Sequence, residues 1–346
     1  MFCSFSVGSI IFPLIITKSH KNKYFKQENN RSMHQGFVST LGGIGIFSGI
    51  FITSSFVSGL LVNYGFYIVS RVYFALFPLI IVFFLGVWDD LEDLKPSQKI
   101  LLQILSGVCL LTLNPNLVIL DLSTLFPLPH IPYLIGFALT LLLIFFIINA
   151  VNLLDGIDGL VGGHLLLSSV FILSVALINS NTELVVLTAS CAGVLLIYLK
   201  YNVFNKRKLF MGDSGSLVLG LFLIFLGLSL REIIQENDME LKYQFSWLFV
   251  LLALPIVDTL RVIYIRLKNK KSIIRPDKNH LHHRYVALGL THFQTSFILN
   301  VLTLVFWILC FYLEFLPELI HFLLMLLMAP FLYLLPLFVF KKDMET

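Results

Sequence analysis

Long apolar runs constrain the fold of this 346-residue chain more than any other feature. Eleven runs approach the ~20 residues that an α-helix needs to cross a bilayer. They lie at about 1–17, 37–62, 66–87, 99–113, 132–150, 160–180, 183–201, 214–230, 245–265, 293–315 and 317–340. The apolar fraction of 58% and the mean hydropathy of +0.90 exclude an ordinary soluble domain. The sequence therefore predicts an all-α, polytopic integral membrane helical bundle of about eleven spans, organised as a single domain over 1–346.

The distribution of Lys and Arg predicts the orientation of these spans, because cytoplasmic segments are enriched in both residues. With the N-terminus outside, twenty Lys and Arg fall in cytoplasmic segments, whereas only Arg231 and Lys242 fall in outside segments. Arg71 and Arg261 lie within spans. We therefore expect the N-terminus outside and the C-terminus in the cytoplasm.

Segment 149–160, NAVNLLDGIDGL, directly follows an apolar run and contains amides and carboxylates at a constant three-residue step: Asn149, Asn152, Asp155 and Asp158. Neighbours at that step lie close together on a helix. The step turns by about 60° each time, so the four do not share one stripe. We interpret the segment as a helix end and a polar loop whose oxygens converge on a ligand, such as a cation with its anionic partner. A solvated loop with helix caps is the alternative.

A cluster of acids follows the third run and comprises Asp89, Asp90, Glu92 and Asp93. Like charges this close repel one another, which indicates a bound cation or a basic partner. A solvated loop in which Lys95 and Lys99 compensate the acids is the alternative. Asp213, in segment 210–216 (FMGDSGS), precedes the eighth span, where a helix N-terminus favours an anion. The same four-residue pattern also occurs in ordinary turns and caps.

The most basic loop, 275–285, contains three histidines: His280, His282 and His283. Zinc would require a softer set of ligands, so a phosphate-binding loop is favoured over a metal site. A plain positive cytoplasmic loop is the alternative. Asp258 lies at the cytoplasmic end of the ninth span, where an ionisable group is costly and suggests function. Its pairing with Arg261 would be a purely structural explanation. On the second span, Gly45 and Gly49 form a small-residue pair that favours close helix packing.

In the predicted orientation these polar clusters all fall on the cytoplasmic side, at the ends of different spans. Acids and amides suit a hard divalent cation, and basic residues suit phosphates. Phosphoryl transfer at the cytoplasmic membrane surface uses these groups together.

Five polar segments of the chain together resemble one family of membrane enzymes. In their order and spacing, these segments closely resemble the motifs of the polyprenyl-phosphate N-acetylhexosamine-1-phosphate transferases. They lie at 31–43, 89–103, 149–160, 210–216 and 275–289. The resemblance covers about 31–289. It implies a multi-pass enzyme of the bacterial inner membrane, often a homodimer. Such an enzyme transfers a sugar 1-phosphate from a UDP-N-acetylhexosamine to undecaprenyl phosphate, releases UMP, and uses Mg²⁺, with Mn²⁺ as a substitute.

The resemblance also implies roles for single residues. Asn152 and Asp213 correspond to the Mg²⁺ ligands, and Asp89 and Asp90 to the catalytic acids beside the lipid phosphate, with Asp89 favoured. The implied substrate-binding residues are Lys99 for phosphate, Asp155, Asp158 and Phe210 for uridine, and His280, His282 and His283 for the sugar and pyrophosphate.

The first segment departs from the family pattern, because Ser32 and Ser39 stand where the family has Lys and Pro. The patterns HLHHR (280–284) and VSTLGG (38–43) favour an N-acetylglucosaminyl donor over the muramoyl-pentapeptide donor of peptidoglycan synthesis.

A cation-coupled transporter is the alternative from another functional class, but a transporter would be expected to have charged residues near the middle of the membrane and two repeated halves. A CDP-alcohol phosphotransferase would space its aspartates differently. Nothing in the sequence indicates nucleic-acid binding.

Overall fold

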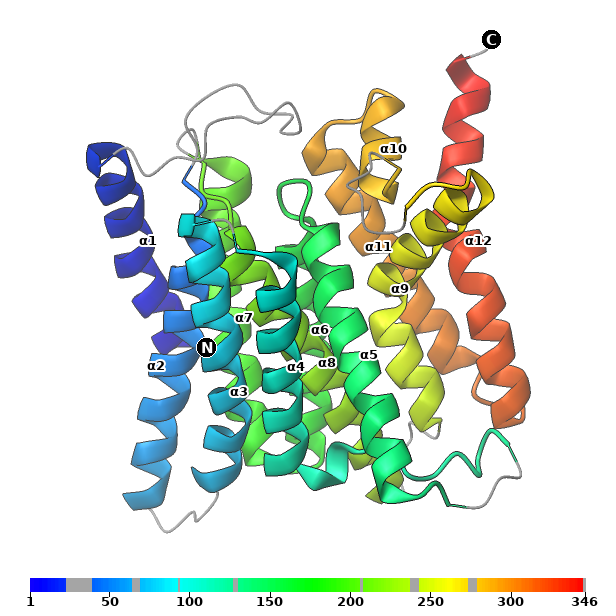
Figure 1. Cartoon of the computed structure of the whole chain (residues 1–346), viewed down its shortest axis with the longest axis horizontal. Coiled ribbons are helices and arrows are strands. Elements are labelled where there is room, and N and C mark those ends of the chain that lie inside the picture. Colours follow the sequence, from blue (N-terminus) through cyan, green and yellow to red (C-terminus); the bar gives the residue numbers. More distant parts are fainter. Residues whose placement is uncertain are drawn as a thin grey trace. The chain divides into compact units, whose positions relative to one another are not determined.

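The computed structural model describes residues 1–22, 39–63, 69–92, 94–126, 130–205, 208–236, 243–272 and 279–344. Within these ranges eleven helices are long and apolar enough to cross a membrane (Figure 1). The extended pairing in the described residues is one isolated bridge between Ser39 and Leu209. The predicted all-α, polytopic fold and the number of spans are thereby confirmed.

The chain divides into two compact units, and each is described by itself. Unit 1 comprises 1–114 and 165–222, and unit 2 comprises 115–164 and 223–346. Helices α6 (Leu160–Ile178) and α8 (Gly212–Glu236) each contribute residues to both units. The single domain expected from the sequence stays a prediction.

Unit 1 is built around α2 (Gly42–Asn63), which packs against three other helices: α1 (Phe2–Asn22), α3 (Val69–Glu92) and α7 (Thr182–Leu199). Helix α4 (Pro96–Leu113) packs on α3, and the π-helical turn η2 (Lys200–Phe204) continues α7. The glycines of α2 allow this packing. A Cβ on Gly45 would lie 2.2 Å from the Phe12 ring, and one on Gly49 would lie 2.4 Å from Val194. The predicted close helix contact at this glycine pair is therefore confirmed.

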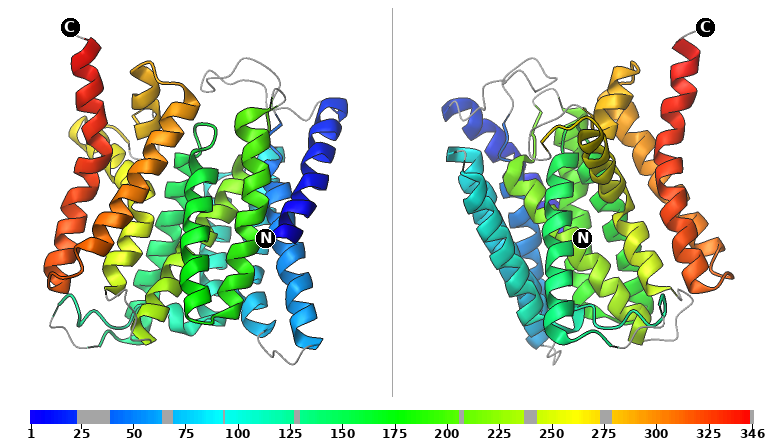
Figure 2. Two further views of the ribbon diagram at one scale, coloured as in Figure 1. Left: turned by 180° about the vertical axis from the view of Figure 1, so that it is seen from behind. Right: turned by 45° about the vertical axis from the view of Figure 1, so that its right-hand side comes forward.

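Unit 2 is built around α9 (Gln244–Lys268), which packs against α5 (Tyr133–Leu154), α11 (His292–Tyr312) and α12 (Glu318–Met344). Figure 2 shows α11 and α12 side by side. The short helix α10 (Leu281–Ala287) packs on α11 and α12, and the 3₁₀ turn η1 (Pro115–Leu117) precedes α5. The buried Tyr285 of α10 donates its hydroxyl to the Tyr333 carbonyl oxygen at 2.9 Å. This bond fixes the histidine-containing helix to the membrane-spanning part of its unit.

Two helices extend further than their apolar runs. Helix α5 continues to Leu154, and α3 continues to Glu92. Several predicted site residues therefore lie on final helical turns rather than in loops: Asn149, Asn152, Asp89 and Asp90. A helix restricts the directions in which their side chains can point.

Candidate active site

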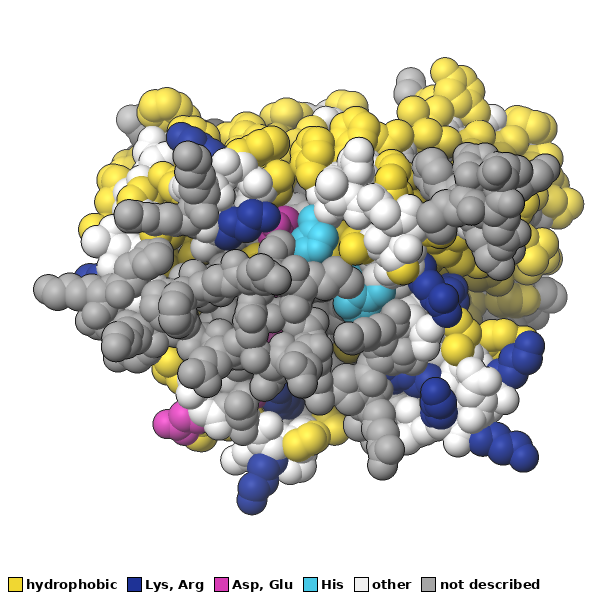
Figure 3. All heavy atoms as spheres, turned by 90° about the horizontal axis from the view of Figure 1, so that it is seen from above, with side chains coloured by type: hydrophobic (Ala, Val, Ile, Leu, Met, Phe, Trp, Pro, Cys, Tyr) yellow, Lys and Arg dark blue, Asp and Glu magenta, His cyan; other side chains and the backbone are white. Residues whose placement is uncertain are grey.

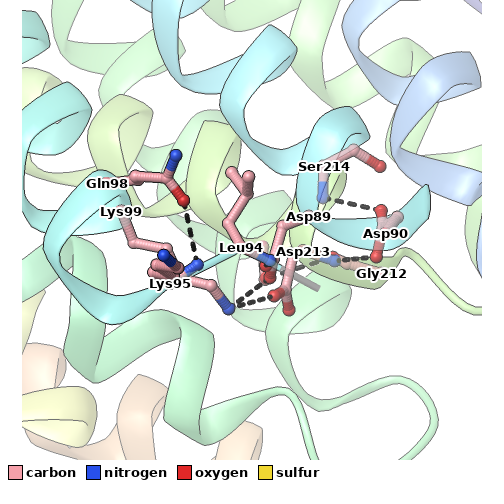
Figure 4. Close-up of polar contacts among 10 residues, drawn as sticks. Asp89, Asp90, Leu94, Lys95, Gln98, Lys99, Gly212, Asp213 and Ser214 are labelled. Atoms are coloured by element: carbon pink, nitrogen blue, oxygen red, sulfur yellow. Dashed lines mark hydrogen bonds and ion pairs between the residues drawn. The ribbon is translucent and has the colours of Figure 1, made fainter. Parts of the chain in front are cut away.

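In unit 1, Asp89 is a buried carboxylate on the last turn of α3, with only 1% of its surface exposed. One oxygen accepts the Leu94 N–H at 2.8 Å, and the other forms an ion pair with Lys99 Nζ (Figure 4). Lys99 is held there because α4 begins at Pro96, where the Lys95 backbone N–H donates to the Gln98 side-chain oxygen at 3.1 Å. A buried charge without a partner is costly, so the lysine offsets the burial of Asp89.

Lys99 lies between two carboxylates. Its Nζ is 3.6 Å from Asp213 Oδ2, on the first turn of α8, in addition to its pair with Asp89. The Lys99 and Asp213 side chains are about one-third exposed, at 34% and 32%, so this side of the group faces outward. We call Asp89, Lys99 and Asp213 the carboxylate–lysine cluster. It unites three residues that the sequence distributes over three helices.

Asp90 acts as a cap for α8. Its two oxygens accept the backbone N–H groups of Asp213 and Ser214, at 2.9 and 3.0 Å. The first N–H groups of a helix lack partners within the helix, and the positive end of the helix dipole favours a carboxylate there. Gly212 makes the approach possible with a left-handed φ of +67°, and a Cβ on it would lie 2.2 Å from the Thr40 carbonyl oxygen. Asp90 thus orients the turn that contains Asp213. A catalytic role for Asp90 stays a prediction.

Phe210 lies on an extended segment that is fixed to the start of α2. Its N–H donates to the Ser39 carbonyl oxygen, and its carbonyl oxygen accepts the Gly42 N–H, both at 2.8 Å. The Ser39 hydroxyl is also 2.8 Å from the Ser19 hydroxyl of α1. Arg31, Ser32 and the rest of 31–38 lie outside the described residues. The uridine-stacking role of Phe210 stays a prediction.

In unit 2, segment 149–160 forms the end of α5 and the turn into α6. Asn149 donates its side-chain amide to the Phe145 carbonyl oxygen at 2.7 Å, and Asp155 is the C-cap of the helix. The left-handed φ of +80° at Gly159 then turns the chain into α6. Asp158 is buried, whereas Asn152 and Asp155 are partly exposed. The structure therefore presents this segment as a helix end and a polar turn, as the sequence predicted.

Helix α10, which contains His282, packs against this turn. A Cβ on Gly156 would lie 2.1 Å from His282 Nε2, so only a glycine leaves room for the imidazole. His282 is buried, and in the described part of the chain neither of its ring nitrogens has a hydrogen-bond partner. Burial lowers the pKa of His282 to about 3, so the ring is neutral near pH 7. The His283 ring centroid is 4.2 Å from that of His282. The predicted site segment 149–160 and the described part of the other, 279–285, therefore meet within unit 2.

Helix α11 contributes residues that the sequence analysis missed, because they lie beyond 289. His292 Nδ1 is 3.8 Å from Asp158 Oδ2, and the Ser296 hydroxyl donates to the Asp158 carbonyl oxygen at 2.5 Å. A histidine at the polar start of the tenth apolar run was the available signal.

The partners of Asp258 differ from the structural alternative considered above. Asp258 is fully buried, and its carboxylate contacts His280 Nδ1 at 2.7 Å and accepts the Leu281 N–H at 2.6 Å. Arg261 instead donates to the Asn279 carbonyl oxygen. Asp258 therefore pairs with His280 and Leu281, and the alternative in which it pairs with Arg261 is wrong.

Carboxylate oxygens such as those of Asp213 in unit 1 are the kind of ligand that suits Mg²⁺. Among the described residues there is no group of three or more His, Cys, Asp or Glu side chains placed to hold a metal. Magnesium, however, usually takes one or two carboxylates together with water and substrate phosphate oxygens. Asp213, which is about one-third exposed, is one such carboxylate. Asn152 belongs to unit 2, and its role as a ligand stays a prediction.

The view onto one end of the helices shows where charged groups lie on the described surface. Lys and Arg side chains, together with His and acidic side chains, are visible on this face, and hydrophobic side chains lie along part of its edge (Figure 3). Such a distribution is expected of a helix end that faces water beside a lipid-facing flank.

Comparison with known proteins gives one consistent result. The sequence model of glycosyl transferase family 4 matches residues 72–231. A Bacillus subtilis (strain 168) protein named "Probable undecaprenyl-phosphate N-acetylglucosaminyl 1-phosphate transferase" is 30% identical over 313 residues, covering 87% of this chain and 81% of the relative. The undecaprenyl-phosphate alpha-N-acetylglucosaminyl 1-phosphate transferases of Escherichia coli (strain K12) and Salmonella typhimurium (strain LT2) are 28% and 30% identical, and each alignment covers 88% of this chain and 81% of the relative.

Proposed function

This chain belongs to glycosyl transferase family 4, and we propose that it transfers N-acetylglucosamine 1-phosphate from a UDP-sugar to undecaprenyl phosphate, releasing UMP. The product is a lipid-linked sugar that initiates a cell-surface glycan. Similarity to the named transferases over most of both chains supports the lipid acceptor and the sugar. The UDP donor follows from the chemistry of sugar 1-phosphate transfer.

The carboxylate–lysine cluster is the observation that supports this reaction best. A partly exposed lysine held between two carboxylates provides a positive charge at a fixed position, next to oxygens that suit a divalent cation. Lys99 would bind the phosphate of the lipid acceptor. Asp89 holds Lys99 in place and would accept a proton from any acceptor phosphate that arrives protonated. A buried ion pair usually contributes little net stability, so this arrangement favours a functional role over a purely structural one.

In the proposed reaction, an oxygen of the lipid phosphate attacks the β-phosphorus of the UDP-sugar. A new oxygen–phosphorus bond forms, the bond from the β-phosphorus to the bridging oxygen breaks, and that oxygen leaves with UMP. The second pKa of a phosphate monoester is about 6, so the acceptor is already largely dianionic near pH 7. The residues therefore chiefly bind, orient and neutralise charge rather than generate a nucleophile.

We propose Mg²⁺, with Mn²⁺ as a substitute, as the cofactor, held by Asp213 and Asn152. When bound, the cation would neutralise charge on the pyrophosphate and on the departing UMP. Asp90 serves this function indirectly, because it fixes the backbone of Asp213. His280, His282 and His283 would contact the sugar and pyrophosphate, and Asp155, Asp158 and Phe210 the uridine.

We propose the bacterial inner membrane as the location, with the site on the cytoplasmic side and a homodimer as the assembly. The twenty-to-two distribution of Lys and Arg supports this orientation. A cytoplasmic site would also have direct access to nucleotide sugars, which are made in the cytoplasm.

The decisive experiment uses the purified full-length protein with undecaprenyl phosphate and a panel of UDP-sugars. UMP release and lipid product are measured together. We expect turnover with UDP-N-acetylglucosamine or a close epimer, and none with the UDP-muramoyl-pentapeptide. Activity on the pentapeptide alone would replace the donor assignment, and an absence of UMP with every donor would refute the reaction.

A further inference from the structure

Asp258 and His280 form a buried pair that the proposed function does not yet explain. Asp258 is fully buried on α9, and the His280 side chain is 5% exposed. The carboxylate contacts two groups, the His280 ring and the Leu281 backbone N–H at the start of α10. The residues that flank Asp258 along α9 are largely apolar, so an ionised Asp258 requires both donors. The pair therefore links the membrane-spanning helix directly to the histidine segment.

The geometry determines which nitrogen of His280 holds a proton. An ionised carboxylate can only accept a hydrogen bond, so the 2.7 Å contact requires a proton on Nδ1 whether or not the ring is charged. Nε2 lies on the far side of the ring from Asp258, and in the described part of the chain it makes no hydrogen bond. A carboxylate that fixes one imidazole nitrogen in this way sets the tautomer and the orientation of the ring.

The contacts continue from His280 to the turn of 155–158. The rings of His280 and His282 are stacked, with centroids 5.7 Å apart and planes at 12°. His282 in turn lies against Gly156. The backbone of the same segment is fixed by Asp258 through Leu281 and by Arg261 through Asn279. Displacement of His280 would therefore also displace the ring that covers the turn between Asp155 and Asp158.

We propose that Asp258 is a positioning residue for the transfer reaction: it fixes the His280 proton on Nδ1, leaves Nε2 to contact the donor substrate, and holds His282 over Gly156. This inference rests on the proposed function, since the donor is the UDP-sugar. Asp258 itself touches no substrate. It acts through His280, and this gives the inference a distinctive test.

The test is a double-mutant cycle between Asp258→Asn and His280→Gln, measured as UMP release with both substrates varied. Asparagine keeps the shape of the side chain but removes the charge. We expect kcat/KM for the UDP-sugar to fall about 10- to 100-fold, as for other partners that orient a functional histidine. The KM for undecaprenyl phosphate should stay within about twofold. Asp258→Asn should cause no further loss in the His280→Gln background, because the two changes remove one linked effect.

Thr259→Val is the matched control. Thr259 is the next residue of α9, is buried, and has a hydroxyl without a hydrogen-bond partner among the described residues. This variant should retain wild-type rates. If it loses as much activity as Asp258→Asn, or if the losses at Asp258 and His280 multiply, the inference is overturned. Should Asp258→Asn fail to yield monodisperse protein, Asp258→Glu enters the same cycle, with the same expectation of no further loss beside His280→Gln.

A second measurement does not depend on activity. In protein labelled with ¹⁵N-histidine, NMR should show a protonated Nδ1 for one ring, identified as His280 by its loss in His280→Gln. The signal should change in Asp258→Asn, because the asparagine amide then donates to Nδ1. An unchanged signal would refute the pairing. A changed signal in a protein that transfers no sugar phosphate would support the pairing and locate the failure in the proposed function.

Discussion

Asp90→Asn separates a structural role of Asp90 from a catalytic one. In the structure both carboxylate oxygens accept N–H groups of the first turn of α8. Asparagine keeps one oxygen but directs an NH₂ group at the other N–H, so one hydrogen bond is lost together with the charge. A hydrogen bond to a charged group contributes about 1.5–3 kcal/mol. The charge at a helix N-terminus adds roughly 0.3–1 kcal/mol. We therefore expect a loss of about 2–4 kcal/mol in unfolding free energy.

The same change should also reduce activity, because Asp213 lies on the loosened turn. A loss of this size should lower the apparent unfolding temperature by several degrees, since each kcal/mol shifts it by about 2–4 °C in a domain of 150–250 residues. Unfolding is followed in detergent by scanning fluorimetry at one fixed heating rate, beside UMP release. Asp89→Asn is the comparison: it should lower activity with little effect on stability, because Lys99 keeps Asp213 as a partner. A large loss of activity in Asp90→Asn at an unchanged unfolding temperature would refute the capping role and favour direct catalysis.

Three further predictions concern the metal, the topology and the histidine segment. Asp213→Asn and Asn152→Ala should each lower the rate by on the order of 10²-fold or more and alter the Mg²⁺ dependence of UMP release. The control Glu92→Ala, which changes an exposed acid, should have a mild effect. Near-normal rates in both ligand variants would disprove the metal assignment. In a cysteine-free background, a cysteine at Lys271 should be shielded from an impermeant thiol reagent in intact cells and one at Asn237 should react; the opposite pattern would reverse the topology. Burial lowers the pKa of His282 from 6.5 to about 3. Between these two pH values the unfolded chain binds a proton that the folded protein does not, so the free energy of unfolding should fall as the pH drops below about 6.5. The unfolding temperature of His282→Gln should therefore decrease less between pH 7.5 and pH 5 than that of the wild type, and an equal decrease would contradict the neutral, buried ring.

The helical membrane fold could be predicted from the sequence, because each span requires about twenty apolar residues in a row and such a run is visible in the chain. The sequence also identified the polar segments, since charges and amides beside membrane spans are costly without a function. The glycine pair at 45 and 49 indicated close helix packing for the same kind of reason: small residues are needed only where two helices approach closely.

The partners of the polar groups, in contrast, could not be read from the sequence and became known from the packing of the helices. Asp89 and Asp90 are adjacent in sequence and chemically identical, yet one pairs with Lys99 and the other caps α8. The difference arises because consecutive helical residues point about 100° apart, toward different neighbours. Asp258 similarly contacts His280, twenty-two residues away in sequence, rather than Arg261 on the next turn of its own helix. Such pairings depend on how helices pack against one another, and the order of residues along the chain does not record that arrangement.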